Sequence, residues 1–191
     1  MFDWLFGGRK AKSAQKTGGE PSATSDMDSR FLRIRNKDFF GQFAKSPSGR
    51  YTVAWRDGHF VGTANGGSKK VSGRVLLLDG DKVVVDRKMP RPNDGKVADT
   101  GVFIIHDSVD FETLSGVFHA INVQGETVVK KRFAANMLNN GLSDDGRLAV
   151  CQTANAPNRD GNILTVFDLT KGAEIARWEP ESGWADKYEF P

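Results

Sequence analysis

The sequence has a single cysteine, Cys151, and no long apolar run. One cysteine excludes an internal disulfide framework and is compatible with a reducing compartment. No apolar run approaches the roughly 20 residues that a helix needs to span a bilayer. The apolar block at the N-terminus is short, and its basic residues follow it, whereas a secretory signal has them in front. We therefore expect a cytoplasmic protein.

Motifs typical of catalysis or cofactor binding are also missing. The 191 residues contain three histidines and neither a G-x-S-x-G elbow nor a Walker-type phosphate loop. We interpret the glycine-rich stretch 66–70 as a flexible connection between strands. Residues 158–162 read as a turn, because Leu169 stands where a calcium loop requires a carboxylate. The sequence predicts no catalytic residue, no cofactor and no metal ligand, and it favours a non-enzymatic protein without deciding the point.

Glycine, by contrast, is abundant, with 21 residues, and it marks three similar units. In each unit one glycine precedes an apolar strand, a second opens another strand and a third makes the turn that follows. The first and third glycines recur at spacings of 45 to 52 residues, which indicates an internal repeat. In chain order the landmarks are Gly49, Gly73 and Gly80, then Gly101, Gly116 and Gly125, and last Gly146, Gly161 and Gly172.

The predicted strands are apolar on both faces, which indicates that each sheet is covered on both sides. The sequence therefore predicts an all-β protein of three four-stranded antiparallel sheets, at about residues 40–89, 90–133 and 138–179, stacked face to face. His106 and His119 occupy strand positions and are expected to pack inside the sheets. Asp79, Asn122 and Asp168 end strands before a turn, where a side-chain oxygen can accept hydrogen bonds from the turn's backbone.

Two segments carry a resemblance to a known class of repeat. SPSGRYTVAW (46–55) and LSDDGRLAVCQ (142–152), each followed by glycine, an apolar strand and aspartate, resemble blades of β-propeller proteins of the WD-repeat and Tol-type S-P-D-G kind. The resemblance covers residues 30–191 and implies a fold of propeller blades, but not an activity. The second unit departs from the pattern at residues 98–101, and the Gly-His and Trp-Asp pairs of true WD repeats are absent.

The ends of the chain do not fit into the three units. Residues 1–29 are expected to form a flexible tail, because the stretch from Ser13 to Ser29 is polar and lacks apolar periodicity. Residues 30–36 read as a lone outer strand and residues 184–190 as a lone inner strand of a fourth blade. Since propellers typically have four to eight blades, we expect a homodimer that completes a six-bladed ring or an open arc docked on another protein. A relic of a longer propeller is the alternative.

Two surfaces are candidates for binding a partner. A loop face of the propeller would gather basic residues able to attract an acidic protein, whereas few aromatics lie among them, so binding of nucleic acid is not favoured. The second candidate is an aromatic and basic N-terminal segment that makes weak contact with a membrane surface. The loop-face residues are Arg56, His59, Lys69, Lys70, Lys88, Arg91 and Arg159, and the membrane-contact residues are Phe2, Trp4, Leu5, Phe6, Arg9 and Lys10.

These surfaces lead to three functional hypotheses. The first is a non-enzymatic scaffold that binds another protein, or a second copy of itself, through the loop face. The second is a sensor or enzyme for a small ligand or metal near the blade axis, where His59, Asp107 and Arg159 would converge. The third is recruitment to a membrane surface through residues 1–16.

Overall fold

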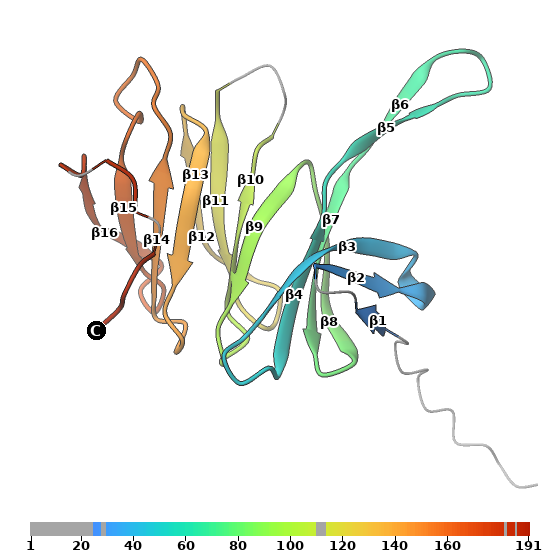
Figure 1. The fold of residues 1–191 in the computed structure, drawn as a ribbon, viewed down its shortest axis with the longest axis horizontal. Helices are drawn as coiled ribbons and strands as arrows, with labels where there is room; N and C mark the ends of the chain where they lie inside the picture. The colour runs from blue at the N-terminus through green and yellow to red at the C-terminus, as the bar shows by residue number, and fades with distance from the viewer. Residues whose placement is uncertain (1–24, 28–29, 110–113, 182, 186) are drawn as a thin grey trace, which may run out of the picture.

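The computed structural model describes residues 25–27, 30–109, 114–181, 183–185 and 187–191. In this part of the chain the fold is all β, apart from one 3-10 turn, η1 (Arg35–Lys37). Figure 1 shows three antiparallel sheets that stand side by side along the long axis of the molecule. None of the described residues belongs to a helix with the length and apolar character that a bilayer crossing requires.

The first sheet has six strands in the order β1-β2-β3-β4-β7-β8. A two-stranded hairpin, β5–β6, is inserted between β4 and β7 and projects away from the stacked sheets (Figure 1). We call the hairpin, residues 59–71, the arm. The strand bounds are β1 (Ser25–Met27), β2 (Phe31–Ile34), β3 (Phe39–Lys45), β4 (Tyr51–Arg56), β5 (His59–Gly62), β6 (Ser68–Val71), β7 (Gly73–Asp79) and β8 (Lys82–Met89).

The second and third sheets have four strands each, in the orders β9-β10-β11-β12 and β13-β14-β15-β16. The prediction of four-stranded antiparallel sheets is confirmed for these two units, whereas the first sheet has six strands, and none of the sheets closes on itself. The strand bounds are β9 (Pro92–Val97), β10 (Phe103–Asp107), β11 (Gly116–Ile121), β12 (Thr127–Phe133), β13 (Met137–Leu142), β14 (Leu148–Thr153), β15 (Leu164–Asp168) and β16 (Ala173–Trp178).

Two apolar layers hold the three sheets together. Alternate residues of β10 point to opposite faces, so Phe103 and Ile105 pack against the first sheet while Ile104 packs against the third. The layer toward the first sheet also contains Trp55, and the layer toward the third contains the stacked rings of Phe118 and Phe167. The prediction that the strands are covered on both faces is therefore confirmed for β10.

The outer face of the first sheet is covered by its own N-terminal strands. Leu32 and Ile34 of β2 and Phe39 of β3 form a buried cluster with Ala54, Leu76 and Leu78 of β4 and β7. A sheet that bends back in this way needs close backbone approach, and Gly41 supplies it: a Cβ there would lie 2.1 Å from the carbonyl oxygen of Trp55. The prediction of a lone outer strand at residues 30–36 is wrong, because β2 pairs with β3 inside the first sheet.

The C-terminal segment lies across β13 and β14 and forms no strand at residues 183–185 and 187–191. The Ala185 amide donates to Gln152 Oε1 at 3.2 Å, and the Tyr188 hydroxyl donates to Asn139 Oδ1. The prediction of a lone inner strand at residues 184–190 is therefore wrong in the described part of that segment. The side-chain amide groups of Gln152 and Asn139 thus bind this segment, whereas the sequence predicted backbone hydrogen bonds between strands.

The turns lie where the glycines predicted them. Six of the landmark glycines have φ between 56° and 82°, a region that favours glycine: Gly49, Gly80, Gly101, Gly125, Gly146 and Gly172. Asn122 and Asp168 accept backbone hydrogen bonds from their turns, as predicted. Asp79 does not, because its carboxylate binds the Arg50 guanidinium instead. The predicted flexible connection at 66–70 is also wrong in part, because β6 begins at Ser68.

Candidate functional site

Three cations form one cross-strand row on the first sheet. In the strand register Arg56 of β4 lies opposite Arg74 of β7, which in turn lies opposite Lys88 of β8. Like charges that face each other across adjacent strands destabilise a sheet, so the stability of the sheet does not explain this row. The row lies at the end of β4 and β7 from which the arm projects. It is on the same face of the sheet as Ala54 and Leu76, which form the pair two residues further along the strands.

The middle cation of the row is the only one of the three with a carboxylate partner among the described residues. The Arg74 guanidinium donates to both oxygens of Asp86, at 2.7 and 2.5 Å, and also to the backbone oxygen of Lys37 at 2.8 Å. These hydrogen bonds hold the pKa of the Asp86 carboxyl below its usual value and raise the pKa of Arg74. Lys37 lies 3.7 Å from the same carboxylate. Asp86 is thus already shared between two cations.

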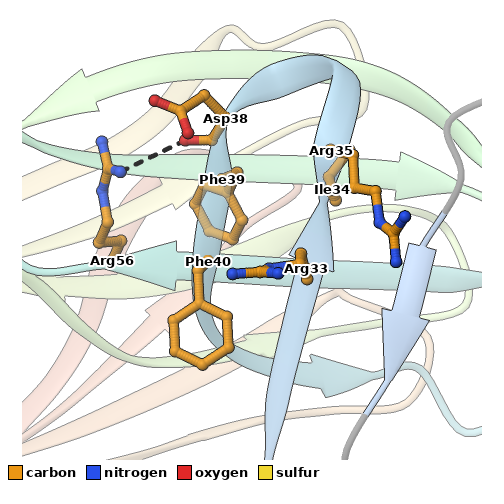
Figure 2. A pocket seen from close by; sticks show the side chains of 7 residues that line it. All are labelled: Arg33, Ile34, Arg35, Asp38, Phe39, Phe40 and Arg56. Carbon is orange, nitrogen blue, oxygen red and sulfur yellow. Dashed lines mark hydrogen bonds between the residues drawn. The ribbon is translucent and has the colours of Figure 1, made fainter.

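Arg56 is positioned by the backbone of the turn above it. Its Nη1 donates to the carbonyl oxygen of Asp38 at 3.4 Å, a bond drawn in Figure 2. Its Nε is buried and has no hydrogen-bond acceptor among the described residues. A buried donor without an acceptor costs free energy, and an anion in the hollow would meet only the accessible part of the Arg56 guanidinium. Guanidinium groups suit anion binding because their planar donors match carboxylate and phosphate oxygens.

The arm brings two more cations to the hollow beside this row. Lys69 and Lys70 of β6 line a hollow of about 500 Å³ together with Val71, Ser72, Gly73, Arg56, Arg74 and Lys88, and Asp86 is the one carboxylate among its described lining residues. Neither arm lysine, nor Lys88, makes an ion pair in the described part of the chain. We call Arg56, Lys69, Lys70, Arg74 and Lys88 the basic arm face.

A second, smaller hollow shares Arg56 with the basic arm face. It measures about 270 Å³ and is lined by residues of β2, η1, β3 and β4, which Figure 2 shows around the β2–β3 turn. Arg33 lies 5.9 Å from the centre of the Phe40 ring, and Phe40 stacks on Phe31 at 5.3 Å while half of its surface stays exposed. The positive surface therefore continues from the arm around Arg56 to the edge of β2.

The structure brings together four of the seven predicted loop-face residues around one hollow, and the other three do not line it. Arg56, Lys69, Lys70 and Lys88 line the larger hollow. His59 is exposed on β5, Arg91 forms a 3.3 Å ion pair with Asp57, and Arg159 lies on the third sheet in the loop before β15. The six residues predicted to contact a membrane lie outside the described residues: Phe2, Trp4, Leu5, Phe6, Arg9 and Lys10.

The residues proposed for a site near the blade axis are dispersed. His59 lies on the arm, Asp107 at the end of β10 and Arg159 on the third sheet, and Asp107 accepts the backbone N–H groups of Arg91 and Val109. In the described residues no group of three His, Cys, Asp or Glu side chains is placed to hold a metal ion. The basic arm face is therefore the better candidate for a functional site.

Potential catalytic groups in the interior are held in unreactive forms. Burial lowers the pKa of His106 to about 3, and its Nε2 accepts a hydrogen bond from the Asn140 amide at 3.0 Å. The thiol of Cys151 is fully buried, and burial raises its pKa far above the usual value. Both side chains therefore act as neutral members of the packed interior, as their strand positions predicted.

Sequence reasoning missed Arg33 and Arg74 as parts of the positive surface. Arg74 was hidden because it begins an apolar strand, and only the register with Arg56 and Lys88 reveals the row. Arg33 was assigned to a strand outside the first sheet. Arg74 lies opposite Arg56 because β4 pairs with β7. The sequence did not reveal this pairing, because the inserted arm lengthens the segment between the two strands.

No known protein-family profile matches the sequence, and no characterised protein matches it at a significant level. A functional proposal for this chain therefore depends on its geometry alone.

Proposed function

We propose that this protein is a non-enzymatic interaction module that binds an acidic segment of another protein through the basic arm face. The observation that carries the proposal is the cross-strand row of Arg56, Arg74 and Lys88, extended by Lys69 and Lys70 and opposed by Asp86 alone. An acidic partner would offset the repulsion within this row.

The location of the face supports binding over catalysis. The arm lysines are exposed, and the arm that carries them projects away from the second and third sheets (Figure 1). Charges arranged in this way raise the rate of encounter with an oppositely charged partner more than they tighten the final complex. We therefore expect binding that weakens steeply with added salt.

The test is a charge-neutralising variant, Lys69→Gln/Lys70→Gln/Lys88→Gln, compared with wild type for binding of labelled poly-L-glutamate by fluorescence anisotropy. The matched control is Lys45→Gln/Lys82→Gln/Lys130→Gln, which removes the same charge from exposed lysines outside the hollow. We expect about tenfold weaker binding in the first variant at low salt and little change in the control.

Equal losses in the two variants would contradict the proposal, because net charge and not the basic arm face would then determine binding. Absence of binding by the wild-type protein at low salt would contradict it as well. Single-stranded oligothymidylate and vesicles of anionic phospholipid serve as competing probes. Tighter binding of either one through the same lysines would assign the face to nucleic acid or to a membrane instead.

We also propose that the three large sheets are blades of a propeller-type arrangement. Equivalent turns of neighbouring sheets contact each other in support of this: the Ser48 N–H donates to Asp99 Oδ1 at 2.9 Å, and the Asp99 N–H donates to the Asp144 oxygen at 3.0 Å. A second copy would continue the stack, and Trp178 on the third sheet keeps 45% of its surface exposed. Light scattering tests this: a mass of one chain at every concentration would contradict a homodimer.

A second candidate function is contact with an anionic membrane surface by a cytoplasmic protein. It is supported by the pairing of β1 with β2, which brings the chain from the N-terminal segment to the side of the first sheet that carries Arg33 and Arg35. A single short anchor holds a protein weakly, so a basic surface beside it would add the second signal. Flotation with anionic vesicles, with and without residues 1–16, tests this candidate, and equal flotation of both forms would reject a role for the segment.

A further inference from the structure

The arm is an unfinished sheet. β5 and β6 pair only with each other, and apart from Val71 at the base every residue in the two strands is exposed. Phe60 keeps 60% of its surface exposed and Val61 keeps 39%. A two-stranded hairpin alone is marginally stable in water, and its two free edges present unpaired backbone groups. The arm therefore has backbone groups and apolar surface available for a third strand.

The β6 edge of the arm is better suited to accept an added strand than the β5 edge. Six consecutive residues, from Lys69 on β6 to Arg74 on β7, line the larger hollow, whereas no residue of β5 does so. β8 runs beside β7 as far as the pair of Gly73 with Met89. A strand added along β6 would therefore continue the line of β8 beyond Met89 and would occupy the hollow.

The charges around this edge specify what kind of strand fits. Lys69 and Lys70 are neighbours in a strand, so their side chains point to opposite faces of the arm. An added strand would place one residue opposite each of them, and cross-strand pairs of opposite charge are favourable. Two adjacent acidic residues would satisfy both lysines, and a β-branched residue would pack beside Val71.

We propose that the β6 edge of the arm takes an extended acidic peptide as a third strand, with two adjacent acidic residues opposite Lys69 and Lys70. The proposal rests on the proposed function and adds the mode of recognition: backbone hydrogen bonds supply affinity and the lysines supply specificity. Lys88 and Arg56 lie where the added strand reaches the first sheet, and both can pair with further carboxylates.

The test uses a capped peptide of sequence TVTEEVTV and measures its binding to the full chain by isothermal titration calorimetry at low salt. Two derivatives carry N-methyl groups on alternate residues, one set on the odd positions and the other on the even positions. Successive backbone N–H groups of a strand point to opposite edges, so only one set of methyl groups faces β6. We expect one derivative to bind about tenfold more weakly and the other to bind like the parent peptide.

The outcomes separate this inference from the proposed function. If both methylated peptides bind as well as the parent and the Lys69→Gln/Lys70→Gln variant loses binding, strand addition is wrong while the basic arm face keeps its proposed role. If neither the peptide nor poly-L-glutamate binds wild type, both are wrong. Preference for oligothymidylate or anionic vesicles over the peptide would also overturn the inference.

Hydrogen exchange gives an independent measurement on the same complex. Saturation with the parent peptide is expected to slow amide exchange at residues 68–71 by about tenfold, because β6 gains a neighbouring strand. The amides of β14 in the third sheet serve as the internal control and should not change. Binding without slower exchange at β6 would contradict strand addition.

Discussion

The strands of the second sheet and those of the arm represent the two extremes of this molecule. Every residue of β10 and β11 is buried, whereas in β5 and β6 only Val71 is partly covered. Both pairs are antiparallel hairpins with similar strand lengths and both contain Val and Phe. The strands of β10 and β11 are mainly apolar, whereas the apolar residues of the arm strands are Phe60, Val61 and Val71, so the two hairpins differ both in composition and in what covers them.

The difference shows which part of the chain maintains the fold and which part is free for binding. β10 and β11 are stabilised by layers on both faces, so a change there disturbs three sheets at once. Among the described residues, no side chain of β5 or β6 belongs to the apolar clusters, so loss of the arm would leave the apolar layers intact. Exposed residues of an uncovered hairpin, such as Lys69 and Lys70, are not constrained by packing, so their side chains can suit the binding of a partner.

The largest expected effect comes from removing a ring from the layer between the second and third sheets. Phe118 is fully buried and stacks on Phe167, with ring centres 4.8 Å apart. The Phe118→Ala variant should lose about 3–5 kcal/mol of unfolding free energy, because the cavity cannot fill from two rigid sheets. Urea unfolding followed by circular dichroism measures the loss, and Phe118→Leu should show a smaller one.

The matched change on the arm is Phe60→Ala. Its ring is mostly exposed, so we expect a change within about 0.5 kcal/mol. A loss in Phe60→Ala comparable with that in Phe118→Ala would show that the arm is part of the cooperative fold and would remove the distinction between the two regions.

The second prediction concerns pH and again contrasts the interior with the arm. Burial lowers the pKa of His106 to about 3 and that of His119 to about 4, while the unfolded chain has histidines of pKa about 6.5. Below pH 6.5 the unfolded chain therefore binds protons that the folded chain does not. Stability that is fully present above pH 6.5 should fall by about 1.4 kcal/mol per pH unit and histidine as the pH decreases toward 4.

Urea unfolding between pH 7.5 and 5 measures this slope. His106→Gln and His119→Gln should each have a shallower slope than wild type, whatever their stability at pH 7.5. The control is Phe60→Ala, because this ring is mostly exposed on the arm and does not titrate, so the slope should be unchanged. Identical slopes in all four proteins would contradict a role for the buried histidines.

The sequence allowed prediction of the parts of the fold that depend on local chemistry. Turn glycines such as Gly49 and Gly146 are readable because a positive φ is a property of one residue. Burial of His106 was likewise predictable, because it occupies the strand position of Ala54 and Cys151 in the other units. The pairing of β2 with β3 was not, because it depends on how far the first sheet bends around Gly41.

The candidate site was predictable only as a set of basic residues near one end of the strands. Arg56, Lys69 and Lys88 were named from their loop positions, but Arg74 completes the row only through the strand register. Arg159 lies in the loop before β15 of the third sheet, as the repeat predicted, but it does not line the hollow that holds the others. The repeat pattern does not show which loop carries an extended hairpin, because the arm is inserted between β4 and β7 of the first unit and is not part of the repeat.

The third prediction compares two glycines with the same backbone conformation. Gly146 has φ of 71° and Gly66 has φ of 77°, so alanine strains the backbone similarly at both positions. A Cβ at Gly146 would lie 2.5 Å from Thr100 Oγ1 of the neighbouring unit, whereas at Gly66 it would meet nothing within 4 Å. We expect Gly146→Ala to cost about 2–4 kcal/mol of unfolding free energy.

For Gly66→Ala we expect a loss of less than about 0.5 kcal/mol, because the arm can open without unfolding the sheets and so release the strain. The measurement is urea unfolding for both variants and amide exchange at residues 59–71 for Gly66→Ala, which should become faster. Equal losses at the two glycines would mean that the turns of neighbouring sheets do not support each other.

The smallest effect on stability is expected where the effect on binding is greatest. Lys69, Lys70 and Lys88 have no ion-pair partner among the described residues, and they face other cations across the hollow. Replacing all three by glutamine should leave the unfolding free energy within about 0.5 kcal/mol of wild type or raise it slightly, because repulsion is removed. Thermal unfolding at low and high salt measures this, and the gain should disappear at high salt, where the repulsion is screened. A clear loss of stability at low salt would show that the lysines hold the arm in place, and the basic arm face would then be part of the fold and no longer a surface reserved for a partner.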